Sequence, residues 1–155
     1  MAAVAPDPGE IEKSQGRDEH VAEPVAESVG LLDTSVFIAR ESGRRLAVEE
    51  LPERSAVSAV TIGELRWGVL MAPDDETRSR RLDTLSDATR LDPVPIDEHV
   101  AAAWALLRQR LKTAGTKMEI NDSWIAATAI AHRWPVVTQD DGFPVDIPDL
   151  AVIKA

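Results

Sequence analysis

The stretch Gly30-Leu-Leu-Asp-Thr-Ser-Val-Phe-Ile38 decides the fold class of this chain. Its first three residues form a short apolar run, which is typical of a buried strand in a parallel sheet. Asp33, Thr34 and Ser35 follow, all of residue types that begin helices, and the apolar residues after them fit a helix. The stretch therefore predicts a strand that passes through a short loop into a helix.

The same change from strand to helix recurs along the chain. Residues 56–60 are a second strand candidate, and Thr61 can cap a helix over 62–71 in which Glu64 takes the third position, as in a capping box. Apolar periodicity, capping residues and Gly or Pro residues predict further elements. These are helices over 74–89, 97–112 and 121–132, and short strands over 91–96, 136–138 and 151–153. Asn121 or Asp122 opens the last of these helices.

Short apolar strands that alternate with amphipathic helices predict an α/β fold. We expect a three-layer α/β/α sandwich around a central, mostly parallel sheet of about four or five strands. In sheets of this type, ligands bind beyond the carboxyl ends of the strands. Polar residues that directly follow strands are therefore the candidate functional residues.

The composition limits the chemistry that the chain can perform. Its 155 residues fit a single folded domain, and none of them is a cysteine. Disulfides and thiolate metal sites are therefore excluded, so any metal must bind to carboxylates, imidazoles or water, which favours a hard cation. No apolar run reaches about 18 residues, and the N-terminus has no secretory signal pattern. We expect a cytoplasmic protein with no membrane partner.

The formal charge of −10 at first argues against a nucleic-acid partner. Residues 1–28 hold seven acids and two bases, so this segment carries −5, and the rest of the chain holds 20 acids and 15 bases. The segment is rich in Ala, Pro and acids and has no Leu or aromatic residue, which predicts a disordered tail. The alternative is that the working protein begins near Val29. In both cases the folded domain is predicted to span residues 29–155.

Acidic side chains follow several predicted strands or open predicted helices. They are Asp33, Glu64, Asp122, Asp140 and Asp141. Taken singly, the first three are explained by helix N-termini and the last two by a turn before Gly142. Taken together, four or five acids at one edge of a sheet would repel one another unless they were protonated or bridged by cations. We therefore expect a site for a divalent metal ion.

Four segments of the chain resemble the PIN domain family, and within it the VapC-type toxins. They are Gly30–Ile38, Ser58–Gly68, Asn121–Ala129 and Pro135–Phe143. Any one of them is a weak signal, whereas four in order and at the right spacing over residues 29–155 are specific. In the last segment the family often has an Asp directly before the Phe, where this chain has Gly142. The match places the fourth acid at Asp140, with Asp141 open as a substitute.

The resemblance implies a PIN-like fold and a metal-dependent ribonuclease that is the toxin of a bacterial toxin–antitoxin pair. The implied catalytic residues, which would hold one or two Mg²⁺ or Mn²⁺ ions, are Asp33, Glu64, Asp122 and Asp140. The resemblance also implies an RNA substrate, a homodimer, and a cognate VapB-like antitoxin that blocks the acidic pocket, commonly with an inserted Arg side chain. A guanidinium is attracted to unpaired carboxylates, which gives this inhibition a physical basis.

Hydroxyl and basic side chains complete the candidate site. The hydroxyls of Thr34, Ser35 and Thr138 are predicted either to position the acids and water or simply to cap helices and turns. Phosphate contacts are expected from four arginines: Arg40, Arg44, Arg45 and Arg66. Another group of bases is interpreted as a solvated charged face: Arg108, Arg110 and Lys112.

Three alternatives remain beside the nuclease. A catalytically silent PIN-like module that binds RNA or protein would have no need of the four acids. An aspartyl-phosphate phosphatase would need a second Asp two residues after Asp33, where this chain has Ser35. A dinucleotide-binding domain would need a Gly-rich loop after the first strand, and none follows it. The predicted function is therefore the ribonuclease, and its RNA target cannot be read from the sequence.

Overall fold

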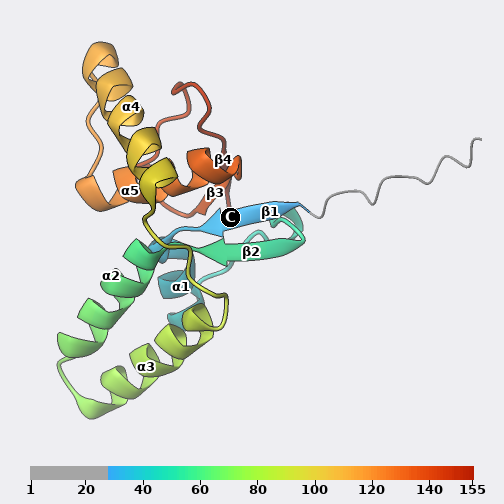
Figure 1. The fold of residues 1–155 in the computed structure, drawn as a ribbon. Helices are drawn as coiled ribbons and strands as arrows, with labels where there is room; N and C mark the ends of the chain where they lie inside the picture. The colour runs from blue at the N-terminus through green and yellow to red at the C-terminus, as the bar shows by residue number, and fades with distance from the viewer. Residues whose placement is uncertain (1–27) are drawn as a thin grey trace, which may run out of the picture.

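The computed structural model describes residues 28–155 (Figure 1). The elements follow in the order β1 (Val29–Leu32), α1 (Thr34–Glu41), the short 3-10 helix η1 (Val48–Glu50), β2 (Arg54–Val57), α2 (Ala59–Leu70), α3 (Asp75–Thr89), α4 (Glu98–Ala114), α5 (Ile120–His132), β3 (Val136–Thr138) and β4 (Val152–Lys154). The disordered tail predicted over residues 1–28 lies outside the described residues, apart from Ser28. Within the described part of the chain, no helix is long and apolar enough to cross a membrane.

The four strands form one parallel sheet in the order β2-β1-β3-β4. Leu31 of β1 lies opposite Ala56 of β2 and Val136 of β3, and Val136 in turn lies opposite Val152 of β4. Parallel strands need crossover connections. α1 forms the connection from β1 to β2, and α2 to α5 form the connection from β2 over β1 to β3. The predicted parallel sheet is confirmed.

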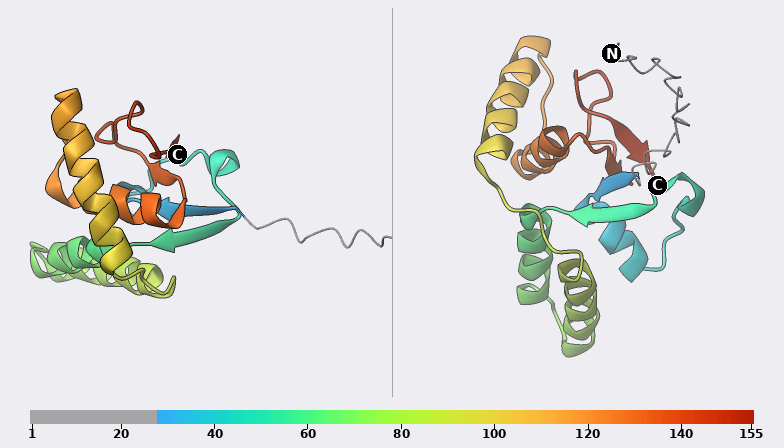
Figure 2. Two further views of the ribbon diagram at one scale, coloured as in Figure 1. Left: turned by 45° about the horizontal axis from the view of Figure 1, so that its top comes forward. Right: turned by 45° about the vertical axis from the view of Figure 1, so that its right-hand side comes forward.

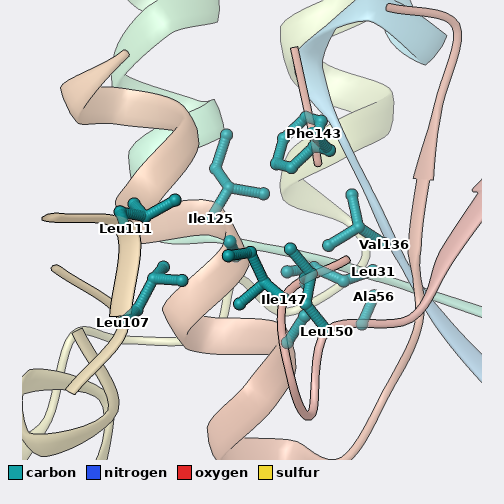
Figure 3. Packing of buried hydrophobic residues seen from close by; sticks show 11 residues of the cluster. Leu31, Ala56, Leu107, Leu111, Ile125, Val136, Phe143, Ile147 and Leu150 are labelled. Carbon is teal, nitrogen blue, oxygen red and sulfur yellow. The ribbon is translucent and has the colours of Figure 1, made fainter. Parts of the chain in front are cut away.

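Helices cover both faces of the sheet, as Figures 1 and 2 show, with α1, α2 and α3 on one face and α4 and α5 on the other. Side chains alternate along a strand, so Leu31 packs under α4 and α5 while Leu32 packs under α1, α2 and α3. Figure 3 shows the first of these clusters, to which Leu107, Ile125 and Phe143 all belong. Full burial of one such side chain contributes roughly 1.5–3 kcal/mol. The predicted three-layer α/β/α sandwich is confirmed.

Residues 91–96 do not form the strand that the sequence predicts. Val94 alone makes a parallel bridge, to Ser58, and backbone hydrogen bonds of 2.8 and 2.9 Å hold it there. Pro93 and Pro95 stand on either side, and proline has no N–H group with which to extend the pairing. The strand prediction is therefore wrong, because the prolines limit the pairing to one residue.

Two helices begin earlier than the sequence predicts. α2 begins at Ala59, and the Ser58 Oγ accepts a backbone N–H of its first turn at 3.1 Å, so Ser58 rather than Thr61 is the cap. α5 likewise begins one residue before the predicted start at 121. Glu64 thus lies in the second turn of α2, so its carboxylate does not take part in capping the helix N-terminus.

Candidate active site

The carboxyl end of the sheet brings together acids from four parts of the chain. Asp33 follows β1 directly, and Asp140 stands two residues after the end of β3. Glu64 comes from the second turn of α2 and Asp122 from the first turn of α5. Burial raises the pKa of Asp122 to about 6, and the charges of the other three carboxylates add to this rise. The four predicted site acids therefore lie within electrostatic reach of one another.

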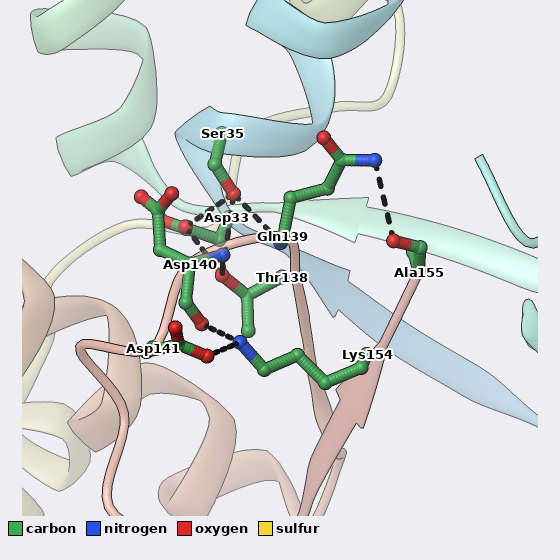
Figure 4. Close-up of polar contacts among 8 residues, drawn as sticks. All are labelled: Asp33, Ser35, Thr138, Gln139, Asp140, Asp141, Lys154 and Ala155. Carbon is green, nitrogen blue, oxygen red and sulfur yellow. Dashed lines mark hydrogen bonds and ion pairs between the residues drawn. The ribbon is translucent and has the colours of Figure 1, made fainter. Parts of the chain in front are cut away.

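Asp33 is the most deeply buried acid of this group, with 2% of its surface exposed. Its Oδ2 accepts hydrogen bonds from the Ser35 Oγ at 2.8 Å and the Thr138 Oγ1 at 2.9 Å (Figure 4). Asp33 occupies the N-cap position of α1, but its carboxylate makes no capping hydrogen bond to the helix, so hydrogen-bonded capping does not explain this acid. The predicted contact between the hydroxyls and the acid is confirmed, and it fixes the orientation of the carboxylate.

Glu64 is positioned by the hydroxyl of Thr34, the residue that follows Asp33. The Thr34 Oγ1 donates to the Glu64 Oε1 at 3.0 Å and lies 3.2 Å from the Thr61 Oγ1. Burial raises the pKa of Glu64, the Thr34 hydrogen bond opposes that rise, and the charge of Asp33 adds to it. Glu64 therefore holds its proton more tightly than an ordinary Glu, unless a cation compensates the repulsion.

Asp122 faces a space that Gly142 leaves open. A Cβ atom built on Gly142 would lie 3.1 Å from the Asp122 Oδ2, which is a tight contact. Any other residue at position 142 would therefore crowd this carboxylate. With glycine there, one side of the half-buried Asp122 side chain stays accessible to an ion or a ligand.

Asp140 and Asp141 point to different partners. Figure 4 shows the Asp140 side chain turned toward Asp33, whereas Asp141 is turned toward Lys154. The Lys154 Nζ pairs with the Asp141 carboxylate, and this hydrogen bond and charge lower the pKa of Asp141. The Asp140 backbone N–H donates to the Thr138 Oγ1 at 3.0 Å, which ties Asp140 to the hydroxyl that also holds Asp33. This geometry favours Asp140 over Asp141 as the fourth acid.

The donor atoms at the site suit a hard divalent cation. They are carboxylate and hydroxyl oxygens, the ligands that Mg²⁺ and Mn²⁺ prefer. Among residues 28–155, no three His, Asp or Glu side chains form a ready-made metal cluster. The acids instead stand apart and repel one another, and a divalent ion between them would remove that repulsion. The residues therefore fit a metal by their chemistry and charge.

Two of the arginines predicted to contact phosphate have other neighbours. Arg40 lines a hollow together with Asp83 and Asp87 of α3. The Arg44 Nε donates to the Ser42 Oγ at 3.3 Å. Neither contact leads toward the four acids, so the phosphate role of these arginines stays a prediction.

Other bases lie closer to the site than the sequence suggested. Arg108, Lys112 and Lys117 line a groove that Asp122 and Gly142 also line. The sequence pattern favours a solvated face for Arg108 and Lys112 and does not single out Lys117. The available signal was the four-residue spacing of Arg108 and Lys112, which places both on one face of a helix, shortly before an acid of the site.

Known proteins resemble this chain over most of its length. The PIN domain model matches residues 30–145. Ribonuclease VapC5 of Mycobacterium tuberculosis is 47% identical over 116 residues, which cover 75% of this chain and 86% of the relative. Ribonuclease VapC4 of the same species is 48% identical over 123 residues, which cover 79% and 94%.

The fold agrees with these sequence matches. The crystal structure of VapBC-5 from Mycobacterium tuberculosis, a member of the VapBC family of toxin–antitoxin systems, contains a chain that is 40% identical with a TM-score of 0.77. The match covers 83% of this chain and 99% of that chain. Family model, sequence relatives and fold therefore agree, and the chain belongs to the PIN domain family, among the VapC ribonucleases.

Proposed function

We propose that this chain is a metal-dependent endoribonuclease that acts in the cytoplasm as the toxin of a type II toxin–antitoxin pair. The observation that carries the proposal is the convergence of Asp33, Glu64, Asp122 and Asp140 at the carboxyl end of the sheet. Burial and the neighbouring acids raise the pKa of Asp122 to about 6, in keeping with this clustering. Such a cluster costs folding free energy in the absence of a cation. Its retention is explained by a bound metal and a reaction, and the VapC relatives named as ribonucleases support phosphodiester hydrolysis of RNA.

The residues that would hold Mg²⁺ or Mn²⁺ are the four acids: Asp33, Glu64, Asp122 and Asp140. When bound, the ion supplies Lewis acidity to the phosphoryl group and makes water a better nucleophile for in-line attack. The contribution of the chain itself is orientation. Ser35 and Thr138 fix the Asp33 carboxylate, and Thr34 fixes Glu64, so the ligands do not need to be ordered when the substrate binds.

A protein partner belongs to the same proposal. A second groove, between α1, α2 and α3, contains the exposed apolar side chains of Ile38, Trp67 and Met71 and reaches Glu64. An antitoxin segment with an apolar face fits such a groove, and an Arg near its end would be attracted to the acids. The similarity to the VapBC-5 toxin–antitoxin system supports this partner. We also propose a homodimer, which light scattering on the purified full chain would test.

The direct test is cleavage of total cellular RNA by the purified full chain in Mg²⁺ or Mn²⁺, followed by mapping of the new ends. We expect discrete cuts that disappear in EDTA and in Asp33→Asn, because Asn keeps the shape of the side chain but loses the anionic ligand. Asp141→Asn is the matched control, since the Asp141 carboxylate is paired with Lys154. This control should cut at the same positions as the unmodified chain.

Two results would contradict the proposal. Full activity of Asp33→Asn would remove that acid from the metal site. A folded, antitoxin-free protein that binds RNA but cuts none of it under any of these conditions would instead be a catalytically silent binding module.

A further inference from the structure

A groove with a volume of about 790 Å³ runs along α4 and the α4–α5 loop to the acidic site. Its charged lining consists of three bases and, at the end nearest the site, two acids: Arg108, Lys112, Lys117, Glu119 and Asp122. Arg108 and Lys112 are four positions apart on α4, so their side chains project from the same face of the helix. The groove is therefore basic along its length and acidic where it meets the proposed site of cleavage.

The three bases of the groove have no acidic partner within the described part of the chain, where no carboxylate lies within ion-pair distance of them. Three bases of α3 and its C-cap differ, because each pairs with an acid three or four residues away at 3.2–3.4 Å: Arg78, Arg80 and Arg90. A base that is already paired with an acid attracts an anionic ligand only weakly, whereas a base without such a partner attracts it with its full charge. The groove is therefore a local band of positive charge on an acidic protein.

Arg108 has a defined place in this band. Its guanidinium carbon lies 5.8 Å from the centre of the Trp104 ring, and Trp104 stacks on Trp124 with 4.4 Å between the ring centres. The Trp104 Nε1 donates to the Ser123 Oγ at 3.0 Å, and Ser123 is the residue next to Asp122. One packed unit therefore carries both the cation and the first turn of the helix that bears the site acid.

We propose that this groove holds the sugar–phosphate backbone of the RNA strand on one side of the bond that is cut, with Arg108, Lys112 and Lys117 as phosphate contacts. The inference rests on the proposed function, which requires a polyanion to approach a site formed by four acids. Three cations that have no acidic partner among residues 28–155, in a groove that Asp122 also lines, offset this repulsion. Contacts to the backbone carry no base information, so the groove contributes affinity rather than the choice of cleavage position.

The test compares two triple variants of equal charge. R108Q/K112Q/K117Q removes the bases of the groove, and R78Q/R80Q/R90Q removes the three paired bases of α3 and its C-cap. Both are made in the full chain for cleavage kinetics, and in the Asp33→Asn background for binding without cleavage. Binding is measured by fluorescence anisotropy on a labelled single-stranded RNA of about 12 nucleotides, within the usual footprint of single-strand binding proteins. Circular dichroism checks that both variants are folded.

We expect R108Q/K112Q/K117Q to bind RNA at least tenfold more weakly at low salt, and R78Q/R80Q/R90Q to stay within twofold of its parent. Loss of three phosphate contacts should reduce the slope of log affinity against log salt by about 2, since each contact on a single strand contributes about 0.7. A fourfold rise in salt should then cost the parent roughly 20 times more affinity than it costs the groove variant. In cleavage, KM should rise by a similar factor, while kcat and the mapped cleavage positions stay the same.

Equal RNA affinity and equal salt slopes in the two triple variants would overturn the proposal. So would a groove variant that keeps its RNA affinity but loses binding to a labelled polyglutamate peptide, because that result would assign the groove to an acidic protein segment. The failures are distinguishable. If the chain binds RNA through the groove but cuts none of it, the nuclease is refuted and the groove remains an RNA-binding surface. If both triple variants cleave RNA with the same KM, the groove proposal is refuted and the nuclease stands.

Discussion

At the scale of single residues, the Asp122 carboxylate imposes a stability cost on the metal-free protein. Its pKa rises from an ordinary 3.8 to about 6 in the folded chain, first through burial and then through the charges of Asp33, Glu64 and Asp140. Between these two pH values the folded state binds more protons than the unfolded state, so stability falls as the pH rises. The cost is fully present above about pH 6. After a discount for the solvent-exposed part of the side chain, it is on the order of 1–2 kcal/mol.

We therefore predict that Asp122→Asn stabilises the metal-free protein at pH 7.5 by about 1–2 kcal/mol, because the amide removes a charge that its neighbours repel. The gain should shrink as the pH falls from 6 toward 3.8, the range over which folded and unfolded Asp122 become protonated. Thermal melts in EDTA over this pH range measure it. Added Mg²⁺ should raise the melting temperature of the unmodified chain more than that of Asp122→Asn. A variant that is less stable than its parent at pH 7.5 would contradict the repulsion.

The hydroxyl of Thr138 connects two acids of the candidate site. Its Oγ1 donates to the Asp33 Oδ2 at 2.9 Å and accepts the Asp140 N–H at 3.0 Å. Thr138→Val keeps the shape but leaves both partners without this bond, so we predict a loss of about 1–3 kcal/mol in stability. Loss of such a contact to a ligand carboxylate typically costs about 10–100-fold in metal affinity or activity.

A second buried threonine provides the control for Thr138→Val. Among residues 28–155, the Thr128 Oγ1 bonds only to a carbonyl of its own helix, at 2.8 Å, and Thr128 is as fully buried as Thr138. Cleavage assays on Thr128→Val should show normal activity, and denaturant melts measure the stability of this variant beside that of Thr138→Val. Equal activity losses in the two variants would mean that Thr138 acts through general packing rather than through Asp33.

The sequence predicted that the four acids come together because of where they stand, directly after buried strands or near helix starts at the same sheet edge. Their role as metal ligands stays a prediction. It also singled out the hydroxyls of Thr34, Ser35 and Thr138, although it could not decide between capping and positioning. The choice between Asp140 and Asp141 depends on Lys154, which lies 13 residues beyond Asp141 in the sequence. No local pattern predicts such a contact.

At the scale of elements, α2 carries Glu64, and its first turn depends on a cap. The Ser58 Oγ accepts a backbone N–H at 3.1 Å, so we predict that Ser58→Ala lowers the free energy of unfolding by about 1 kcal/mol and reduces cleavage as the first turn of α2 loosens. Chemical denaturation and cleavage rates measure the two effects. Asp74→Ala removes the corresponding cap of α3, where the Asp74 Oδ1 accepts the Thr77 N–H at 2.7 Å, without touching a helix that bears a site acid. Reduced activity in Asp74→Ala as well would show that stability alone controls the rate.

The position of this cap shows what local patterns leave undecided. Ser58 and Thr61 are both good capping residues, and the spacing of Thr61 and Glu64, which fits a capping box, favoured Thr61. The pairing of Leu32 with Val57 ends β2 one residue before Ser58, and this contact between distant segments decides where α2 begins. Apolar runs and Gly or Pro punctuation predicted most other elements, and the prolines at 93 and 95 explain the strand that failed.

At the scale of the whole molecule, the net negative charge of the chain opposes the approach of a negatively charged RNA substrate. Residues 1–27 hold seven of the acids and two of the bases, so the rest of the chain carries −5 of the total of −10. This excess of negative charge repels a polyanionic RNA over distances of about the Debye length, which is about 10 Å at 0.1 M salt. We expect the bases of the groove to act near the site and the acidic N-terminal segment to act on the approach of the RNA.

We predict that removal of residues 1–27 increases kcat/KM for RNA severalfold at low salt, because a smaller net negative charge speeds the encounter. Ser28 is kept, since its carbonyl accepts the Arg54 N–H at 2.9 Å and so helps to hold β2 beside β1. Cleavage at limiting RNA concentration, measured from about 0.05 to 1 M salt, should show the gain fading as the charges are screened. A full-length chain with the seven acids of this segment changed to Gln or Asn is the control for length, and it should show the same gain. A gain in the shortened chain alone would mean that the segment obstructs RNA by its bulk rather than by its charge.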